Sequence, residues 1–410
     1  MTLSEELQWR GFVNQTTLKD ISQLDKQNWT FYHGFDASAD SQTVGNLAAM
    51  MFDKVFLRHG HKAIVLAGGA TSLLGDPGGK DSERPLQDEK TIAYNVACAE
   101  AQLRKIYGDY TFKLVNNIEW FKTMNVLTFM RDIGKHFSMT PLVQRDYIAK
   151  RMGEGGAGIS YTEFSYTLLQ GYDFLHLHKK YNVNLQLAGS DQWGNSISGV
   201  DLIRRVTGDE THIMTLPLVI NKATGKKFGK SEEGAVWLDE KKTSAFKFYQ
   251  FWLNADDEGV EGYLKIFTEL DKPTIDLVMA EFKENRSGRV AQKRLAYEVT
   301  RIVHGEAKAK SVKKATEFLF TKDEDIVLSN EVAEVLKGEL AHTKLKDAPS
   351  LADALLNTWL AMSKSEANQL IKDGAVSVNG RKVTDPNATP FKNNDNLIKC
   401  GKNRFSIISW

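Results

Sequence analysis

The segment over residues 29–69 restricts the fold of this chain more than any other. Residues 29–35 are mostly aromatic and strand-like, and a polar turn follows them. The turn leads into the apolar stripe of an amphipathic helix, formed by Val44, Leu47, Ala48, Met51, Phe52, Val55 and Phe56. Residues 62–69 are then a short buried strand that ends in two glycines. Strand, helix and strand in this order predict two parallel strands joined by a crossover helix.

The helix of this unit has recognisable ends. Asp40 and Ser41 are candidate caps for a helix that begins near Val44, and Gly60 suits a left-handed residue at its end. The same alternation continues along the chain, with strand-like runs at residues 112–116, 183–188 and 214–220 and helical patterns near residues 92–107 and 164–177. Residues 1–236 are therefore predicted to form a Rossmann-like, doubly wound parallel sheet, an α/β catalytic domain.

The character of the chain changes after Trp237. Helical segments without strand signals occupy residues 245–253, 263–270, 275–282 and 290–304, which predicts an α-helical domain over residues 237–327. Residues 328–350 are charged and only weakly periodic, and we expect a linker there. Ser363 with Glu366 forms a capping box that opens a helix, and Asn379-Gly380 favours a type I′ hairpin. A small α+β domain is expected over residues 351–410.

Composition excludes several classes of protein. A chain of 410 residues with 42% hydrophobic and 26% charged residues is an ordered, multi-domain protein, and no apolar run is long enough to span a bilayer. We therefore expect a cytoplasmic protein without a membrane partner. Cys98 and Cys400 lie far apart and have no paired-ligand spacing, which argues against a disulfide framework and a zinc site. A net charge of +1 means that any nucleic-acid surface must be a local patch.

Two turns could hold a ligand. In the first, over residues 36–46, Gly45 at a helix start would let backbone amides approach a phosphate, although an ordinary capped loop is about equally plausible. The second, over residues 68–84, contains five glycines around Asp76 and is followed by Lys80 and Arg84. Glycine density alone is weak evidence, and a flexible surface connection would explain it slightly better.

Three later segments have a similar ambiguity. Tyr166, Gln170 and Asp173 share one helix face, which in isolation would be a solvated face. Residues 189–194 follow an apolar strand, at the carboxyl end where parallel sheets bind ligands. Residues 226–231 place a glycine between lysines, and most such loops are solvated turns.

Taken together, these segments resemble the tyrosyl-tRNA synthetases of the bacterial type, members of class I, in order and spacing along essentially the whole chain. The motifs that carry the resemblance are YHGFD (32–36), GGAT (68–71), GDP (75–77), EFSY (163–166), LQGYD (169–173), GSDQWG (189–194) and KFGKS (227–231). The last is a variant of the Lys-Met-Ser-Lys-Ser signature of the family. A Rossmann-like catalytic domain, a helical anticodon-side domain and a small RNA-binding domain are the fold that the resemblance implies.

The resemblance implies a binding site for tyrosine. Tyr32 and Asp173 would hydrogen-bond its phenol, Gln192 would orient its carboxylate, and the ammonium would be held by Asp76, Tyr166 and Gln170. Buried groups that pair a substrate hydroxyl are left unsatisfied by phenylalanine, a principle for which this family is itself the standard example.

The resemblance also implies that ATP binds as a substrate with Mg²⁺, without a tightly bound cofactor or a protein-held metal. The ATP-binding positions are Gly34, Asp36, Ser38, Gly45, Gly189, Asp191, Lys227, Lys230 and Ser231, with His33 beside the ribose. The resemblance implies catalytic roles for Thr43, Asn46, Lys80, Arg84, Lys227 and Lys230. The implied reaction is attack of the tyrosine carboxylate on the α-phosphate, followed by transfer to the terminal adenosine of tRNA(Tyr). Alignment and charge stabilisation would supply the catalysis.

One departure from the family pattern concerns the phosphate contacts. Where the family usually has His-Ile-Gly-His, this chain has Thr43-Val44-Gly45-Asn46. Asn46, Thr43 and Ser38 keep shorter donors, and complete loss of one transition-state donor costs roughly 3 kcal/mol. We therefore expect a slower enzyme and not an inactive one.

The C-terminal residues favour an RNA partner. Residues 363–410 contain eight lysines and arginines against four acidic residues, a local net charge of +4. Such a patch suits phosphate contacts, although a solvated basic surface is the alternative. The resemblance further implies a homodimer, with a contact surface around residues 121–137.

Two other functions are weighed against this one. A non-catalytic RNA-binding relative would explain the missing motif histidines, but Tyr32, Asp76, Asp173 and both loop lysines are present. A tryptophan enzyme would share the architecture, yet an indole has no hydroxyl for Tyr32 and Asp173 to pair.

Overall fold

The computed structural model describes residues 1–74, 87–144, 146–153, 155–156, 158–231, 234–320, 328–391, 395–401 and 404–410. This chain forms two compact units. The first comprises residues 1–243 and 254–295, and the second comprises residues 244–253 and 296–410. The helical region expected over residues 237–327 thus contributes to both units. No helix in the described ranges is long and apolar enough to cross a membrane.

A six-stranded sheet forms the centre of the first unit, in the order β1-β6-β5-β2-β3-β4. Its strands are β1 (Gln15–Thr16), β2 (Thr30–Phe35), β3 (Lys62–Ala67), β4 (Phe112–Asn116), β5 (Leu185–Gly189) and β6 (His212–Leu216). All neighbours are parallel except β1, which pairs antiparallel with β6. The predicted doubly wound parallel sheet is confirmed.

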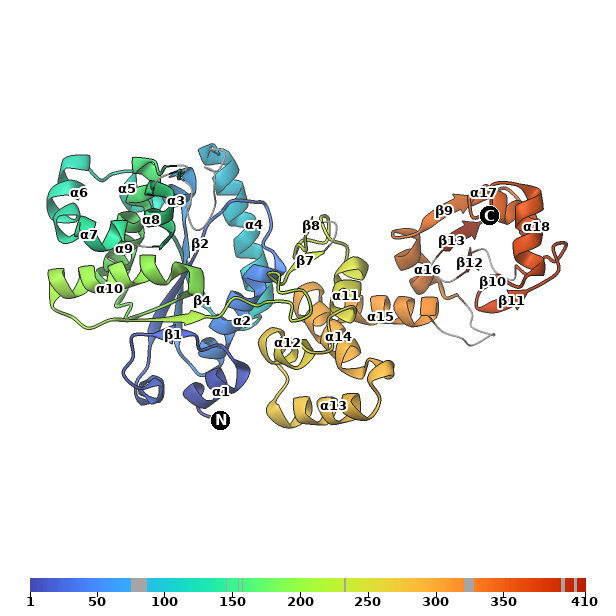
Figure 1. The fold of residues 1–410 in the computed structure, drawn as a ribbon, viewed down its shortest axis with the longest axis horizontal. Coiled ribbons are helices and arrows are strands. Elements are labelled where there is room, and N and C mark those ends of the chain that lie inside the picture. Colours follow the sequence, from blue (N-terminus) through green and yellow to red (C-terminus); the bar gives the residue numbers. More distant parts are fainter. Residues whose placement is uncertain are drawn as a thin grey trace. The chain divides into compact units, whose positions relative to one another are not determined.

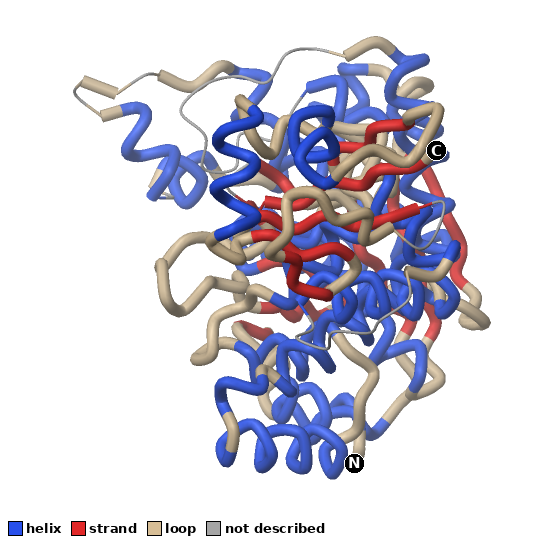
Figure 2. The backbone as a smooth tube through the Cα atoms, turned by 90° about the vertical axis from the view of Figure 1, so that its right-hand side faces the viewer, coloured by secondary structure: helices blue, strands red, loops and turns tan. Residues whose placement is uncertain are grey.

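Helices cover both faces of this sheet (Figure 1). Helices α2 (Val44–Arg58) and α4 (Glu89–Tyr107) lie on one side, and α9 (Tyr161–Tyr181) and α10 (Trp193–Thr207) lie on the other. Successive side chains of β2 point to opposite faces of the sheet and contact helices on both sides. Phe31 packs on Phe56 of α2, with ring centroids 5.3 Å apart. Tyr32 packs on Phe174 of α9, with ring centroids 5.1 Å apart. Figure 2 shows the backbone from another side, with helices in blue and strands in red.

The order of the strands reverses next to β2. The chain runs from β2 outward to β3 and β4 on one side, whereas β5 and β6 lie on the other side of β2. Parallel sheets of this type bind ligands where the order reverses, at the carboxyl ends of the two strands. In this chain those ends are Phe35 and Gly189.

The first unit has further elements besides the sheet and these four helices. They are α1 (Leu3–Arg10), η1 (Ile21–Lys26), α3 (Gly69–Leu74), α5 (Ile118–Phe121), α6 (Val126–Asp132), η2 (Gly134–His136), α7 (Met139–Val143), α8 (Asp146–Met152), η3 (Ser190–Gln192), β7 (Lys230–Ser231), β8 (Gly234–Ala235), α12 (Val260–Phe267), α13 (Lys272–Glu284) and η4 (Arg286–Gly288).

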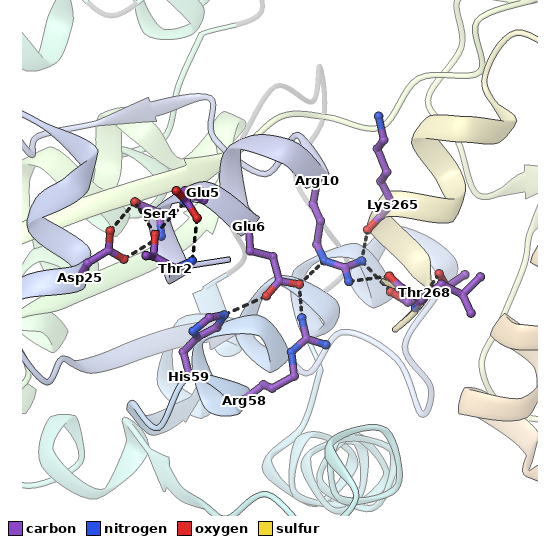
Figure 3. Close-up of polar contacts among 11 residues, drawn as sticks. Thr2, Ser4, Glu5, Glu6, Arg10, Asp25, Arg58, His59, Lys265 and Thr268 are labelled. Carbon is purple, nitrogen blue, oxygen red and sulfur yellow. Dashed lines mark hydrogen bonds and ion pairs between the residues drawn. The ribbon is translucent and has the colours of Figure 1, made fainter. Parts of the chain in front are cut away.

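A buried carboxylate ties the N-terminal helix to the rest of this unit (Figure 3). Glu6 of α1 pairs with Arg10 at 2.6 Å, with His59 at 2.8 Å, and with Arg58. The Arg10 guanidinium also donates to the backbone carbonyls of Lys265, Thr268 and Leu270. One carboxylate and one guanidinium therefore connect α1, the end of α2, and the last turn of α12 with the residues that follow it.

The second unit combines helices with a small sheet. Its helices are α11 (Ala245–Leu253), the later part of α14 (Val290–His304), α15 (Glu306–Phe320), α16 (Asn330–Lys337), α17 (Leu351–Asn357) and α18 (Lys364–Lys372). Its strands are β9 (Ala341–Lys344), β10 (Val376–Val378), β11 (Arg381–Val383), β12 (Asp395–Cys400) and β13 (Arg404–Ser409), in the order β11-β10-β12-β13-β9. The predicted hairpin is confirmed, since Asn379 and Gly380 have positive φ angles of 49° and 84°.

Two local expectations differ from the structure. The N-cap of α2 is Thr43 and not Asp40 or Ser41, because the helix begins only at Val44 and its first turn is closed by Asn46. Residues 328–350, expected to be a linker, carry α16 and β9. Val332, Ala333 and Leu336 are buried there, and β9 pairs parallel with β13.

Candidate active site

A cavity of about 250 Å³ opens at the carboxyl ends of β2 and β5. The predicted site residues that line it are Tyr32, His33, Gly34, Asp36, Ser38, Asn46, Tyr166, Gln170, Asp173, Gly189 and Gln192, and Phe35, Gly68 and Thr71 of the same motifs also line it. The predicted site residues come from β2 and the turn after it, from α2 and α9, and from the end of β5 and η3. The fold therefore brings together most of the predicted site, from segments more than 100 residues apart.

Asp173 of α9 is held by two donors that sequence reasoning missed. The indole Nε1 of Trp120 donates to Oδ1 at 2.8 Å, and the amide Nδ2 of Asn117 donates to Oδ2 at 3.0 Å. Burial raises the pKa of Asp173 to about 7, with a smaller upward effect from Asp36, while the two hydrogen bonds act in the opposite direction. The carboxyl group is thus fixed in position and only weakly acidic.

Asn117 is buried and lies directly after β4. Its Oδ1 accepts a hydrogen bond from the backbone N–H of Ala70 at 2.7 Å, so that the same amide joins α3 to Asp173. A polar residue at the carboxyl end of a predicted parallel strand is the signal in the sequence that could have identified it.

The hydroxyl of Tyr32 is buried and has no hydrogen-bond partner among the described residues. Burial, together with the charge of Asp173, raises the pKa of Tyr32 well above its ordinary value. Buried hydroxyl groups in native proteins normally have a partner. An unpaired one that lines a cavity is a place where a ligand hydroxyl can bind.

Asp36 is the first residue of the turn after β2. Its carboxylate accepts from the Tyr166 hydroxyl at 3.2 Å and from Thr71 Oγ1 at 3.4 Å. A Cβ on Gly68 would lie 2.8 Å from Asp36 Oδ1 and 2.4 Å from Thr71 Oγ1. Only glycine at position 68 permits this packing, which gives the glycine a structural reason.

Gln192 belongs to a chain of amide contacts. The Nδ2 of Asn195 donates to Gln192 Oε1 at 3.2 Å, and Thr167 Oγ1 donates to Asn195 Oδ1 at 2.7 Å. The orientation of the Gln192 amide is set by these contacts with α9 and α10.

The start of α2 reaches the cavity through Asn46. The backbone N–H and the hydroxyl of Thr43 both donate to Asn46 Oδ1, at 3.0 and 2.8 Å. Thr43 and Gly45 are not among the residues that line the cavity. The backbone N–H of Val44 donates to the carbonyl of Val236 at 3.0 Å. The N-terminus of a helix is nevertheless a suitable place for a phosphate.

The lysine loop lies against this helix start. Gly229 has a φ of 99°, and a Cβ there would lie 3.2 Å from the backbone nitrogen of Gly45. Lys227 is exposed, and its backbone bridges to Ile220. Lys230 and Ser231 form β7, of which only the backbone is described.

Several predicted positions lie elsewhere. Asp191 does not line the cavity, and a Cβ on Gly189 would lie 2.8 Å from its Oδ1. Asp76, Lys80 and Arg84 lie outside the described residues. Within the described ranges, no group of three or more His, Cys, Asp or Glu side chains is arranged to hold a metal ion.

Comparison with known proteins identifies two matching families. Residues 24–321 match the family described as tRNA synthetases class I (W and Y), and residues 331–408 match the tyrosine–tRNA ligase SYY-like C-terminal domain. The chain is 40% identical over 420 residues to a tyrosine–tRNA ligase 2 of Bacillus cereus, covering 100% of this chain and 99% of the relative. It is 41% identical over 390 residues to a tyrosine–tRNA ligase 1 of Enterococcus faecalis, covering 94% and 92%.

Solved structures show the same similarity. A C-terminally truncated mitochondrial tyrosyl-tRNA synthetase of Aspergillus nidulans superposes with a TM-score of 0.70 at 30% identity, covering 78% of this chain and 94% of that one. A tryptophanyl-tRNA synthetase of Encephalitozoon cuniculi superposes with a TM-score of 0.55 at 12% identity, covering 76% and 89%. The second similarity concerns the fold alone.

Proposed function

The chain belongs to the class I tyrosyl-tRNA synthetases, and on this basis we propose which of its residues perform the reaction. It activates L-tyrosine with ATP to tyrosyl-adenylate and transfers tyrosine to the 3′-terminal adenosine of tRNA(Tyr). A non-catalytic RNA-binding relative is not favoured, because full-length relatives at about 40% identity are tyrosine–tRNA ligases.

The unpaired hydroxyl of Tyr32, next to a fixed Asp173, is the observation that supports the tyrosine site most strongly. We assign the phenol of the substrate to this position, where it would donate to Asp173 and pair with Tyr32. Phenylalanine would leave the buried Tyr32 hydroxyl without a partner and would not supply the further donor to Asp173. Tryptophan would present a bulkier indole without a hydroxyl.

We place the ammonium and carboxylate groups of the substrate tyrosine on the side of the cavity where Asp36 lies. We assign the ammonium to Tyr166 and Gln170, with Asp76 as a further partner from the family pattern. The Asp36 carboxylate, which accepts from Tyr166, adds negative charge there. Gln192 would orient the tyrosine carboxylate.

We place ATP along the start of α2 and the end of β5. The proposed ATP contacts are Gly34, Asp36, Ser38, Gly45, Asn46, Gly189, Asp191 and Ser231, and the phosphates are assigned to Thr43, Lys80, Arg84, Lys227 and Lys230. The packing of Gly229 on Gly45 supports the placement of the lysine loop beside the helix start. Mg²⁺ would enter as the Mg–ATP complex.

The activation step needs alignment more than acid–base chemistry. A carboxylate oxygen of tyrosine forms a bond to the α-phosphorus, the bond from that phosphorus to the bridging oxygen breaks, and pyrophosphate leaves with the electron pair. Tyr32, Asp173 and Gln192 would hold the nucleophile in line. Helix-start amides and the loop lysines would stabilise the charge that develops on the phosphates.

We propose that the catalytic function resides in residues 1–236, anticodon-side contacts in residues 237–327 and further tRNA contacts in residues 351–410, joined through residues 328–350. In the second unit, Lys382 and Lys399 line a groove of about 250 Å³ between the strands and α15. The cationic side chains there suit an RNA backbone.

Charging of tRNA(Tyr) with labelled tyrosine tests this division. The double variant Lys382→Ala with Lys399→Ala should raise KM for tRNA and reduce its salt dependence, while tyrosine–ATP chemistry stays unchanged. Lys19→Ala with Lys26→Ala removes two exposed lysines elsewhere and is the control. Unchanged KM for tRNA in the first variant would refute the assignment of this groove.

We also propose a cytoplasmic homodimer. Large apolar side chains are exposed on α6 and α7, with exposed fractions of 67% for Val126, 76% for Leu127, 43% for Met130 and 59% for Met139. A patch of this kind is typical of a protein–protein interface. It overlaps the surface around residues 121–137 that the family pattern implies.

A further inference from the structure

A buried carboxylate, that of Asp53, lies outside the lining of the active-site cavity and has no assigned part in the reaction. Asp53 of α2 is fully buried. Its Oδ2 accepts from His33 Nδ1 at 2.6 Å and from the Tyr107 hydroxyl at 2.6 Å, whereas its Oδ1 has no partner in the part of the chain that the structure describes. An incompletely paired carboxylate inside a core is costly, so it calls for an explanation.

The charge of Asp53 is compensated by His33. Within the described chain, the ion pair of Asp53 is with His33. Burial by itself would lower the pKa of His33, but the Asp53 carboxylate outweighs this effect and the pKa is raised. The imidazole next to the cavity therefore carries its proton more readily than an ordinary histidine.

His33 presents this charge to the cavity. Its side chain lines the cavity, is 15% exposed and makes no hydrogen bond besides the one to Asp53 among the described residues. Because Nδ1 is used by Asp53, Nε2 remains as the donor for a ligand. Alternation along β2 places Tyr32 and His33 on opposite faces of the strand, so that His33 lies toward α2.

The family pattern already places His33 beside the ribose of ATP. We propose that Asp53 and Tyr107 hold His33 there as a charged hydrogen-bond donor to ATP, in a chain whose helix-start motif has Thr43 and Asn46 in place of histidines. The inference rests on the proposed function, since it concerns the ATP of that reaction. His33 would touch the nucleotide, and Asp53 and Tyr107 are positioning residues that act through it. Hydrogen bonds from charged donors are stronger than those from neutral donors, which gives the buried carboxylate of Asp53 a function.

Steady-state pyrophosphate exchange measures this contact through KM for ATP and KM for tyrosine. His33→Gln should raise KM for ATP about ten- to hundredfold, the loss expected for a charged hydrogen bond, with KM for tyrosine within about twofold of wild type. Asp53→Asn should act in the same direction, and Tyr107→Phe more weakly. His178→Gln and Asp209→Asn break a comparable histidine–carboxylate contact of 2.9 Å away from the cavity and are the matched controls.

The pH dependence of KM for ATP distinguishes a positioning role of Asp53 from a merely structural one. The titratable groups around His33 are Asp53 on α2, Tyr107 on α4, and Tyr32, Asp36, Tyr166 and Asp173 in the cavity. Below the pKa of His33 the imidazolium is present, so KM for ATP should rise as pH rises through that pKa. Asp53→Asn should move this rise to lower pH, and the rise should be absent in His33→Gln.

The outcomes are distinct. In folded protein, an unchanged KM for ATP in His33→Gln would overturn the proposal. Full additivity of His33→Gln and Asp53→Asn would also overturn it, because residues that act through one another are non-additive. Absence of tyrosine-dependent exchange in the wild-type chain would instead contradict the proposed function.

Discussion

The indole Nε1–H of Trp120 donates a 2.8 Å hydrogen bond to Oδ1 of Asp173, the carboxyl group assigned to the tyrosine phenol. Asn117 donates to the other oxygen, so that the carboxyl group is oriented before any substrate binds. A site built in this way does not have to reorganise on binding. Its partners come from segments that the chain brings together only by folding.

The buried Asp173 should make stability depend on pH. Burial in the folded state raises the pKa of this carboxyl group from 3.8 to about 7. The folded state therefore binds the proton more tightly than the unfolded state. The resulting contribution to stability is complete below pH 3.8 and is lost as pH rises to 7. A rise of about three pKa units corresponds to roughly 4 kcal/mol at most. The stability of Asp173→Asn relative to wild type should therefore increase between pH 4 and pH 8, as measured by urea unfolding. A difference that is independent of pH would contradict this.

Tyr32→Phe should separate stability from binding. Removing a buried hydroxyl without a partner should stabilise the free protein by about 1 kcal/mol. Loss of the same hydroxyl should weaken tyrosine binding about tenfold, because a hydrogen bond to the substrate is lost. Thermal unfolding with and without tyrosine measures both effects. A variant that is less stable without tyrosine would show that the hydroxyl has a partner in the free protein.

Glu6→Gln should destabilise the first unit without affecting the chemistry. The change leaves Arg10, Arg58 and His59 without their carboxylate, at a cost of about 3 kcal/mol. Burial alone would raise the pKa of Glu6, but the hydrogen bonds from Arg10 and His59 outweigh it and the pKa is lowered. The stabilisation is therefore complete above pH 4.5 and is lost as pH falls through the folded-state pKa.

Chemical unfolding at pH 7 and near pH 3 measures this difference. Glu5→Gln, on the same helix but exposed, is the control and should change stability by less than about 0.5 kcal/mol. Equal losses in the two variants would mean that Glu6 contributes only as a helix residue.

Leu127→Glu should shift the protein from dimer to monomer in light scattering coupled to gel filtration. The side chain is 76% exposed, and a charge at a dimer interface would have to be buried without a partner. Leu277→Glu changes an equally exposed leucine of α13, 73% exposed, and should leave the mass unchanged. A monomeric wild type would refute the proposed dimer.

Much of the fold could be predicted because local signals and tertiary packing agree. Strong amphipathic patterns predicted α11 and α14 with the bounds that the structure has. The segment over residues 328–350 escaped prediction because α16 presents only a narrow apolar face, and β9 is a strand only through its pairing with β13. Such pairing depends on residues far away in the chain, which local patterns do not reveal.

The candidate site could be predicted where its residues share a motif. Tyr166, Gln170 and Asp173 lie one turn apart on α9, and their spacing was visible in the sequence. Trp120 and Asp53 could not be recognised in this way, since an indole and a carboxylate on apolar helix faces acquire a role only through the buried groups that they contact.

Tyrosine-dependent exchange of labelled pyrophosphate into ATP by the full chain tests the central claim most directly. Exchange should occur with tyrosine, should be at least about a thousandfold weaker with phenylalanine, and should be absent with tryptophan, because only tyrosine pairs the buried groups at Tyr32 and Asp173. Asp173→Ala should lose the exchange with tyrosine. Folded wild-type protein that gave no exchange, or equal exchange with phenylalanine, would contradict the account.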